Sequence, residues 1–234
     1  MGSIFQFKHF KVDQTDCAMR INTDGVILGA SAAVVSPDQI LDIGTGTGVI
    51  AMMLAQRYPD AWVDAVEIEV QAANRAADNL ANSPFANRSE VIHADINEYV
   101  TNKKYDLIIS NPPFFVNDLK SAEFRKGIAR HAHESFFIKL IKKAATLLTY
   151  RGSLWLILPV KQAEWVILNA ALYSLFPAVI LHVHSDRNKD AFRQIICLTF
   201  TKSVTLTEQI FIYESQGVYT GQYKKLLKEF FLDF

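Results

Sequence analysis

Cysteine is scarce in this chain, which has two among its 234 residues, Cys17 and Cys197. They lie far apart in the sequence and lack the spacing of a metal site. So sparse a set excludes a disulfide-rich secreted scaffold, and we expect both side chains to be reduced thiols of a cytoplasmic protein. The first residues also lack the pattern of a signal peptide, because Lys8 and Lys11 interrupt them and no apolar run follows.

The chain has no excess of charge of either sign. Lys and Arg number 24, Asp and Glu number 24, and the isoelectric point is about 7.0. A surface that is basic throughout, as in many nucleic-acid-binding proteins, is therefore excluded. Any affinity for a polyanion must come from local clusters of Lys and Arg, although a single cluster is more often a solvated face.

No hydrophobic run is long and regular enough to cross a membrane. Residues 165–183 contain no Asp, Glu, Lys or Arg, but Asn169, Ser174 and Pro177 interrupt them. Before the proline the pattern predicts a buried helix, and after it the β-branched residues predict a strand. We therefore expect no transmembrane segment and no membrane partner.

Half of the residues are hydrophobic and 12% are aromatic, which is typical of a folded chain. Strand and helix patterns alternate, which predicts an α/β fold whose mostly parallel sheet has helices on both faces. Only residues 185–191 separate the last two strands, too few for a crossover helix, so these strands should form an antiparallel hairpin. Strands are expected at about 39–43, 62–67, 89–94, 105–110, 152–158, 178–185 and 192–201, and helices at about 46–57, 70–82, 134–149 and 161–175.

We expect a single domain over residues 1–234. An N-terminal extension occupies about 1–35, and residues 219–234 read as an amphipathic terminal helix. No linker, internal repeat or low-complexity segment divides the chain.

The motif Asn111-Pro112-Pro113-Phe114 follows the apolar run 107–109, at the end of an expected strand. Each proline fixes its own φ and restricts the residue before it, so the Asn111 amide and the nearby carbonyl sample few conformations. Two fixed acceptors and an aromatic ring suit an exocyclic amino group on a flat base. The alternative is an ordinary loop after a strand, where prolines are common.

A glycine-rich loop spans residues 42–48, with the sequence Asp-Ile-Gly-Thr-Gly-Thr-Gly. Glycine lets the chain turn tightly and approach a ligand where a Cβ would clash. The spacing differs from the dinucleotide fingerprint, because Val49 occupies the position of its last glycine. It resembles instead motif I of the S-adenosylmethionine-dependent methyltransferases.

Two acids, Glu67 and Asp95, close the next two expected strands. Each alone is most often a solvated strand end. Because open α/β sheets bind ligands at the carboxyl ends of their strands, the common placement of the two acids favours a cofactor site there.

Together, the glycine-rich loop and the Asn-Pro-Pro-aromatic motif resemble those of class I methyltransferases that modify exocyclic or amide nitrogens on a seven-stranded sheet. Such enzymes modify adenine N6, guanine N2 in ribosomal RNA, or the glutamine side chain of release factors. The glutamine branch usually has Tyr where this chain has Phe114. Further segments resemble the bacterial tRNA1(Val) adenine-N6-methyltransferase family, which modifies the adenine next to the anticodon. They are residues 5–14, 19–20, 23–29, 129–131 and 223–234.

The resemblance implies S-adenosyl-L-methionine as cofactor, S-adenosyl-L-homocysteine as product and tRNA as substrate, with no metal and no inferable protein partner. It implies that glycines line the methionine end of the cofactor, that Glu67 binds the ribose and that Asp95 binds the adenine. The implied cofactor-binding residues are Thr23, Asp24, Asp42, Gly44, Gly46, Gly48, Glu67, Asp95 and Asn111.

The same resemblance implies the catalytic and RNA-binding residues. Asn111 and Pro112 accept hydrogen bonds from the target amine and Phe114 stacks on the base, so no general base is assigned. The catalytic residues are Asn111, Pro112, Pro113 and Phe114. The RNA-binding candidates, which follow that loop, are Arg125, Lys126, Arg130 and His131.

Overall fold

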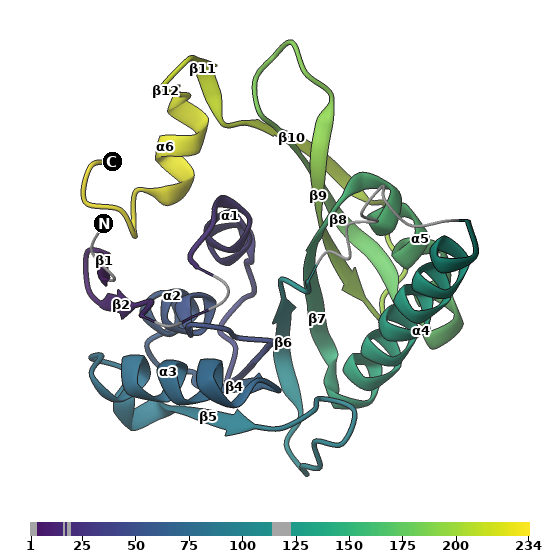
Figure 1. Cartoon of the computed structure of the whole chain (residues 1–234), viewed down its shortest axis with the longest axis horizontal. Helices are drawn as coiled ribbons and strands as arrows, with labels where there is room; N and C mark the ends of the chain where they lie inside the picture. Colours follow the sequence, from purple (N-terminus) through teal and green to yellow (C-terminus); the bar gives the residue numbers. More distant parts are fainter. Residues whose placement is uncertain (1–3, 16, 18–19, 114–122) are drawn as a thin grey trace.

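The computed structural model describes residues 4–15, 17, 20–113 and 123–234, with residues 123–133 described by their backbone. An eight-stranded sheet forms its centre, in the order β10-β8-β9-β7-β6-β3-β4-β5 (Figure 1). Neighbouring strands are parallel except where β9 meets β7 and β8. The strands are β3 (Gln39–Ile43), β4 (Trp62–Glu67), β5 (Ser89–His93), β6 (Tyr105–Ser110), β7 (Leu148–Leu158), β8 (Phe176–His184), β9 (Ala191–Thr199) and β10 (Leu206–Phe211).

Helices cover both faces of this sheet. Along β6, Leu107 and Ile109 pack into one apolar cluster and Ile108 into the other, so this strand is buried on both sides. The first face carries α1 (Thr23–Ser31), α2 (Val49–Arg57) and α3 (Val70–Ala81), and the second carries α4 (Glu123–Leu147) and α5 (Val160–Ala170) (Figure 1). Short 3-10 helices are η1 (Ala86–Arg88) and η2 (Ala171–Tyr173).

The expected α/β fold is confirmed, with a strand at each of the expected positions and β8 and β9 paired as an antiparallel hairpin. The sheet has one strand more than expected, because β10 pairs parallel to β8. The sequence pattern missed β10 because it is an edge strand whose first four residues are exposed. Helix α1 was also not expected, although Asn22 is a typical N-cap and accepts the Gly25 N–H at 2.9 Å.

Helix α5 ends at Ala170, and β8 begins at Phe176 after the short helix η2. The change from helix to strand was expected at Pro177, the second residue of β8. The helix expected to be buried is buried on one face only: α5 buries Ala163, Val166 and Ala170, whereas Leu168 is 75% exposed. Within the part of the chain that the structure describes, no helix is long and apolar enough to cross a membrane.

Neither Cys17 nor Cys197 forms a disulfide bond within the described residues. Cys197 is buried on β9, and burial raises the pKa of its thiol to about 12. A thiol that stays protonated is a poor nucleophile and a poor metal ligand, which agrees with a structural role for this residue.

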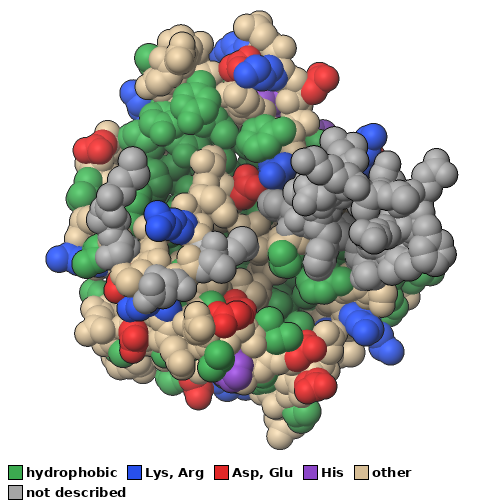
Figure 2. Space-filling model, in the orientation of Figure 1, with side chains coloured by type: hydrophobic (Ala, Val, Ile, Leu, Met, Phe, Trp, Pro, Cys, Tyr) green, Lys and Arg blue, Asp and Glu red, His purple; other side chains and the backbone are tan. Residues whose placement is uncertain are grey.

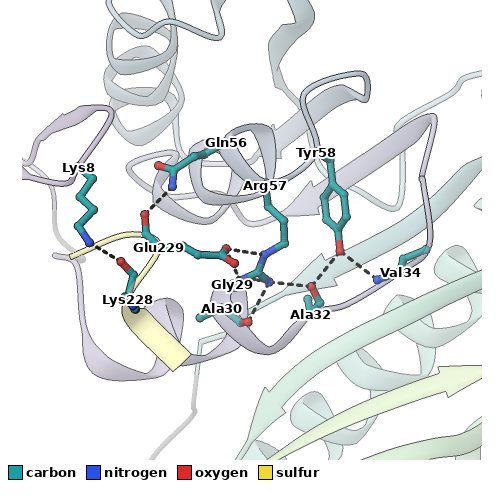
Figure 3. Close-up of polar contacts among 10 residues, drawn as sticks. All are labelled: Lys8, Gly29, Ala30, Ala32, Val34, Gln56, Arg57, Tyr58, Lys228 and Glu229. Carbon is teal, nitrogen blue, oxygen red and sulfur yellow. Dashed lines mark hydrogen bonds and ion pairs between the residues drawn. The ribbon is translucent and has the colours of Figure 1, made fainter. Parts of the chain in front are cut away.

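The C-terminal tail is held at the C-terminal end of α2. There the Arg57 guanidinium donates to the carbonyl oxygens of Gly29, Ala30 and Ala32 and pairs with Glu229 at 3.2 Å (Figure 3). The last turn of α1, α2 and the C-terminal tail are thereby held by one side chain. Ahead of α1, a small hairpin is formed by β1 (Ile4–Gln6) and β2 (Lys11–Asp13).

The C-terminal region is built from a hairpin, β11 (Tyr213–Ser215) and β12 (Val218–Tyr219), followed by α6 (Gly221–Leu227). Helix α6 is shorter than the expected 219–234, although its buried and exposed faces are as expected: Tyr223 and Leu227 are buried, and Lys224 and Lys225 are exposed. Hydrophobic side chains gather on the surface over this region (Figure 2). The same region contains an aromatic stack in which Tyr219 lies 5.1 Å from Tyr213 and 4.9 Å from Tyr223, measured between ring centroids.

Candidate active site at the carboxyl edge of the sheet

The carboxyl ends of four adjacent strands bring the main predicted residues together. Ile43 at the end of β3 pairs with Val66 of β4 and with Ser110 of β6, and Glu67 pairs with His93 of β5. The residues at or just after these ends are Gly44, Glu67, Asp95 and Asn111. They therefore lie along one edge of the sheet, as their positions in the sequence predict.

The glycine-rich loop turns from β3 into α2 through positive φ angles at Gly44 (70°), Gly46 (57°) and Gly48 (82°). A Cβ built on Gly44 or Gly46 meets nothing within 4 Å, so the loop presents bare backbone to open space. At Gly48 the same Cβ lies 3.5 Å from the Ala76 Cβ, which shows that the loop rests on α3. An L side chain rarely adopts such φ values, so these positions favour glycine.

Glu67 anchors that loop from the neighbouring strand. Its Oε2 accepts the Gly46 N–H at 2.8 Å, and its Oε1 accepts the N–H groups of Ile68 and Glu69 at 2.9 and 3.0 Å. Only 8% of the residue is exposed. The carboxylate is thus held by three backbone donors at the point where the open side of the loop begins.

Asp42 lies beneath the loop and has no exposed surface. Its Oδ2 accepts the Thr45 hydroxyl at 2.6 Å and the Ala51 N–H at 3.1 Å, whereas its buried Oδ1 has no partner among the described residues. Burial raises the pKa of the Asp42 carboxyl to about 7; the two hydrogen bonds lower it and the Glu67 carboxylate raises it further. This side chain supports the loop from below, and its expected contact with a cofactor stays a prediction.

Asp95 follows β5 in a turn. Its Oδ1 accepts from the Asn97 N–H at 2.9 Å and from the Asn97 Nδ2 at 2.8 Å, and its backbone carbonyl accepts from Glu98 and Tyr99. The side chain is half-buried at the outer end of the edge. Its carboxylate is therefore held in position while part of it stays accessible.

Asn111 carries the clearest chemical signal at this edge. Its Oδ1 is buried and has no hydrogen-bond partner among the described residues, which is uncommon for an amide oxygen. The preceding Ser110 donates its hydroxyl to the Ile43 carbonyl at 2.8 Å, which ties the end of β6 to β3. Pro112 is buried and Pro113 is exposed, and Phe114 lies outside the described residues.

The first turn of α1 lies beside Asn111. A Cβ built on Gly25 lies 3.7 Å from the Asn111 Nδ2, so the first turn of α1 approaches this amide closely. Thr23 is exposed, and Asp24 forms an ion pair with Arg193 of β9. Gly25 lies in the segment 23–29 that resembles the family but was given no role of its own, and Arg193 was missed because no local pattern in the sequence marks it.

The four residues expected to bind RNA lie in the first turns of α4, and their side chains are outside the described part of the chain. They are Arg125, Lys126, Arg130 and His131. Lys8 is a basic residue of the N-terminal extension. Its ammonium donates hydrogen bonds to the carbonyl oxygens of Lys228 (2.5 Å) and Phe234 (3.2 Å). This ammonium therefore holds the C-terminal tail.

Comparison with known proteins defines the class first. Residues 27–176 match the family model described as the methyltransferase small domain. A predicted O-methyltransferase from Agrobacterium tumefaciens has a similar fold, with a TM-score of 0.69 and 20% identity over 88% of this chain and 96% of that one. A ribosomal protein L11 methylase from Lactobacillus delbrueckii subsp. bulgaricus has a TM-score of 0.58 and 17% identity over 80% of this chain and 83% of that one. The fold is that of the class I methyltransferases.

Sequence relatives then narrow the class. A tRNA1(Val) (adenine(37)-N6)-methyltransferase from Pedobacter heparinus is 54% identical over 100% of both chains. One of the same name from Bacteroides thetaiotaomicron is 39% identical over 97% of each chain. The chain belongs to the tRNA1(Val) (adenine(37)-N6)-methyltransferase family.

Proposed function

We propose that this enzyme transfers a methyl group from S-adenosylmethionine to N6 of the adenine at position 37 of tRNA1(Val), in the cytoplasm. The observation that carries the proposal is the buried, unpartnered Oδ1 of Asn111 at the edge that also holds the open glycine loop. An acceptor without a donor at such an edge suits a ligand that brings an N–H group. The names of the relatives that match over the full length support adenine as that ligand.

The cofactor cradle is the glycine loop with the acids beside it. The bare backbone at Gly44 and Gly46 leaves space that a Cβ would fill, which fits close approach of a ligand. We assign the methionine end to Gly44, Gly46 and Gly48, the ribose to Glu67 and the adenine to Asp95. Thr23 and Asp24 stand at the start of α1 beside the methionine end, and Asp42 positions the loop from below.

The target amine is held by acceptors. When bound, S-adenosylmethionine supplies an electrophilic methyl group. The Asn111 Oδ1 and the Pro112 carbonyl accept the two N–H bonds of the amine and favour the geometry that its nitrogen develops during attack, which is electrostatic preorganisation. Phe114 stacks on the base, and Pro113 stiffens the loop. The methylated nitrogen is acidic enough to lose its proton to water, so we assign no general base, and the products include S-adenosylhomocysteine.

Two other amino or amide nitrogens fit the same acceptors: guanine N2 of ribosomal RNA and the glutamine N5 of a release factor. The family of the chain favours adenine, because its relatives match this chain over the N-terminal extension and the tail as well as over the methyltransferase core. We assign the phosphates that flank the base to Arg125, Lys126, Arg130 and His131 of α4. A base beside the anticodon is single-stranded, so turning it into the site costs at most a few kcal/mol.

The test compares the three substrates side by side. The enzyme is incubated with radiolabelled S-adenosylmethionine and bulk tRNA, ribosomal RNA or release factor, and the labelled product is hydrolysed and analysed. We expect label in tRNA, as N6-methyladenosine. Label in ribosomal RNA as N2-methylguanosine, or in the release factor, would contradict the proposed substrate, and label in none of them would contradict the proposed reaction.

A further inference from the structure

An ion pair between Asp24 and Arg193 joins two distant parts of the chain beside the candidate site. The Arg193 Nε donates to the Asp24 Oδ2 at 2.8 Å, across 169 residues of sequence. Only 13% of the Asp24 side chain and 23% of the Arg193 side chain are exposed. Because the pair is sheltered, salt screens it less than a surface pair, and removing one partner leaves a mostly buried charge behind.

Asp24 stands in the first turn of α1, next to the residue that faces Asn111. The turn begins at Asn22, whose side chain caps it, and a Cβ built on Gly25 would lie 3.7 Å from the Asn111 Nδ2, so this turn lies close to the Asn111 amide. Any shift of this turn therefore changes the surroundings of the Asn111 side chain directly. The position of Asp24 and the orientation of Asn111 are linked through one residue.

Arg193 holds the pair from the opposite side of the edge. Its neighbour Gln194 pairs with Leu158, the last residue of β7, and β7 pairs with β6, whose last residue precedes Asn111. The Arg193 Nη1 also donates to the Phe192 carbonyl at 3.0 Å, and its guanidinium carbon lies 5.3 Å from the centre of the Phe192 ring. These contacts restrain the guanidinium on β9, so its hydrogen bond to Asp24 can hold the first turn of α1 in place.

Polar contacts act on both ends of α1 in addition to its apolar packing, and the Arg57 guanidinium holds the carbonyls of its last turn. The helix rests closely on α2, since a Cβ built on Gly29 would lie 3.1 Å from the Met53 Sδ. Contacts of this kind are non-directional and permit small shifts of one helix along another. The charged hydrogen bond from Arg193 is directional, and it acts on the turn that adjoins Asn111.

We propose that the Asp24–Arg193 pair is a positioning device for methyl transfer: it holds the first turn of α1 against Asn111, so that the acceptor oxygen of Asn111 keeps its orientation. This inference rests on the proposed function. It gives Asp24 a role other than contact with the cofactor, and Arg193 a role other than contact with RNA phosphate. Breaking the pair should therefore slow the reaction of bound substrates and leave their binding intact.

A double-mutant cycle tests the pair, with Asp24→Asn, Arg193→Gln and both together assayed for kcat, for the KM of tRNA and for the Kd of S-adenosylhomocysteine. We expect each single variant to lower kcat roughly tenfold and the double variant to lose no more than either, because all three remove the same interaction. The KM and the Kd should stay within about twofold. Arg193→Lys keeps the charge on a different donor and should recover part of the rate.

The control is Arg75→Gln, which breaks the Arg75–Asp13 pair; this pair has a 2.9 Å contact and side chains that are 24% and 33% exposed. It should leave kcat unchanged.

Additive losses in the double variant would overturn the inference, as would weaker S-adenosylhomocysteine binding in Asp24→Asn alone or a raised tRNA KM at unchanged kcat in Arg193→Gln alone. If Asp24→Asn is unstable, the kcat values of Arg193→Lys and Arg193→Gln still test the inference. An equal loss of kcat in both variants would contradict a positioning role that depends on the charge of residue 193. If the wild-type enzyme labels another substrate, the proposed tRNA activity fails and the same cycle is run on that substrate.

Discussion

Replacing Asp42 with Asn should change how the stability of the enzyme depends on pH. Asp42 is fully buried beneath the glycine loop, and burial raises the pKa of its carboxyl from the ordinary 3.8 to about 7. Between these two values the folded enzyme keeps a proton that the unfolded chain releases. The free energy of unfolding therefore falls as the pH rises through this range, and the contribution of Asp42 is lost once the pH passes the folded pKa.

The magnitude follows from the size of the pKa shift. A shift from 3.8 to about 7 corresponds to roughly 4 kcal/mol over the whole range, of which about 2.5 kcal/mol falls between pH 5 and pH 8. Asn has nearly the same shape and keeps an oxygen that can accept from Thr45 and Ala51, but it does not titrate. The other ionisable groups are common to both proteins, so their contributions cancel in the difference.

Urea unfolding of the wild type and of Asp42→Asn at pH 5, 6, 7 and 8 measures this difference. We expect the wild type to lose about 2.5 kcal/mol relative to the variant between pH 5 and pH 8, and to lose no more above pH 8. Parallel stability curves across the range would refute the reasoning, because they would mean that Asp42 ionises in the folded enzyme as readily as in the unfolded chain.

Two further outcomes are expected. Gly46→Val should abolish binding of S-adenosylhomocysteine in calorimetry, because its side chain enters the open space beside the loop; Gly217→Val, at a similar φ (76°) in the β11–β12 turn, should carry similar strain and bind normally, and equal binding by both would refute this. Binding of tRNA should weaken steeply with salt, and Arg125→Ala/Lys126→Ala/Arg130→Ala should reduce the log–log slope by about two units, at about 0.7 per phosphate on single strands; an unchanged slope would place the RNA elsewhere.

The fold was largely predictable because its central strands are buried on both faces. Such strands appear in the sequence as short apolar runs, as at 107–109, and the segments between them have room for helices. Strand β10 was missed because an edge strand with exposed residues at 206–209 carries no such run. Helix α1 was missed because its central residues, Gly25 to Ala30, are all buried, so it shows no polar face with a helical period.

The candidate site was predictable where it depends on backbone conformation. The positive φ values at Gly44, Gly46 and Gly48 favour glycine, and the prolines Pro112 and Pro113 mark the loop that follows β6. What could not be predicted depends on contacts made by folding. The Asp24–Arg193 pair spans 169 residues, and the burial of Asp42 depends on how the loop closes over it. Neither leaves a local pattern in the sequence.

The central claim is that Asn111 presents the acceptor for an adenine amino group. Nucleoside mass spectrometry of an unmodified tRNA1(Val) transcript, incubated with S-adenosylmethionine and either the wild type or Asn111→Ala, tests it most directly. We predict N6-methyladenosine at position 37 with the wild type and a rate about 10²–10³ lower with the variant, because one preorganised acceptor of the transition state is lost. Binding of S-adenosylhomocysteine should be nearly unchanged. An Asn111→Ala enzyme that keeps most of its turnover, or a wild type that leaves this adenine unmethylated, would contradict the account.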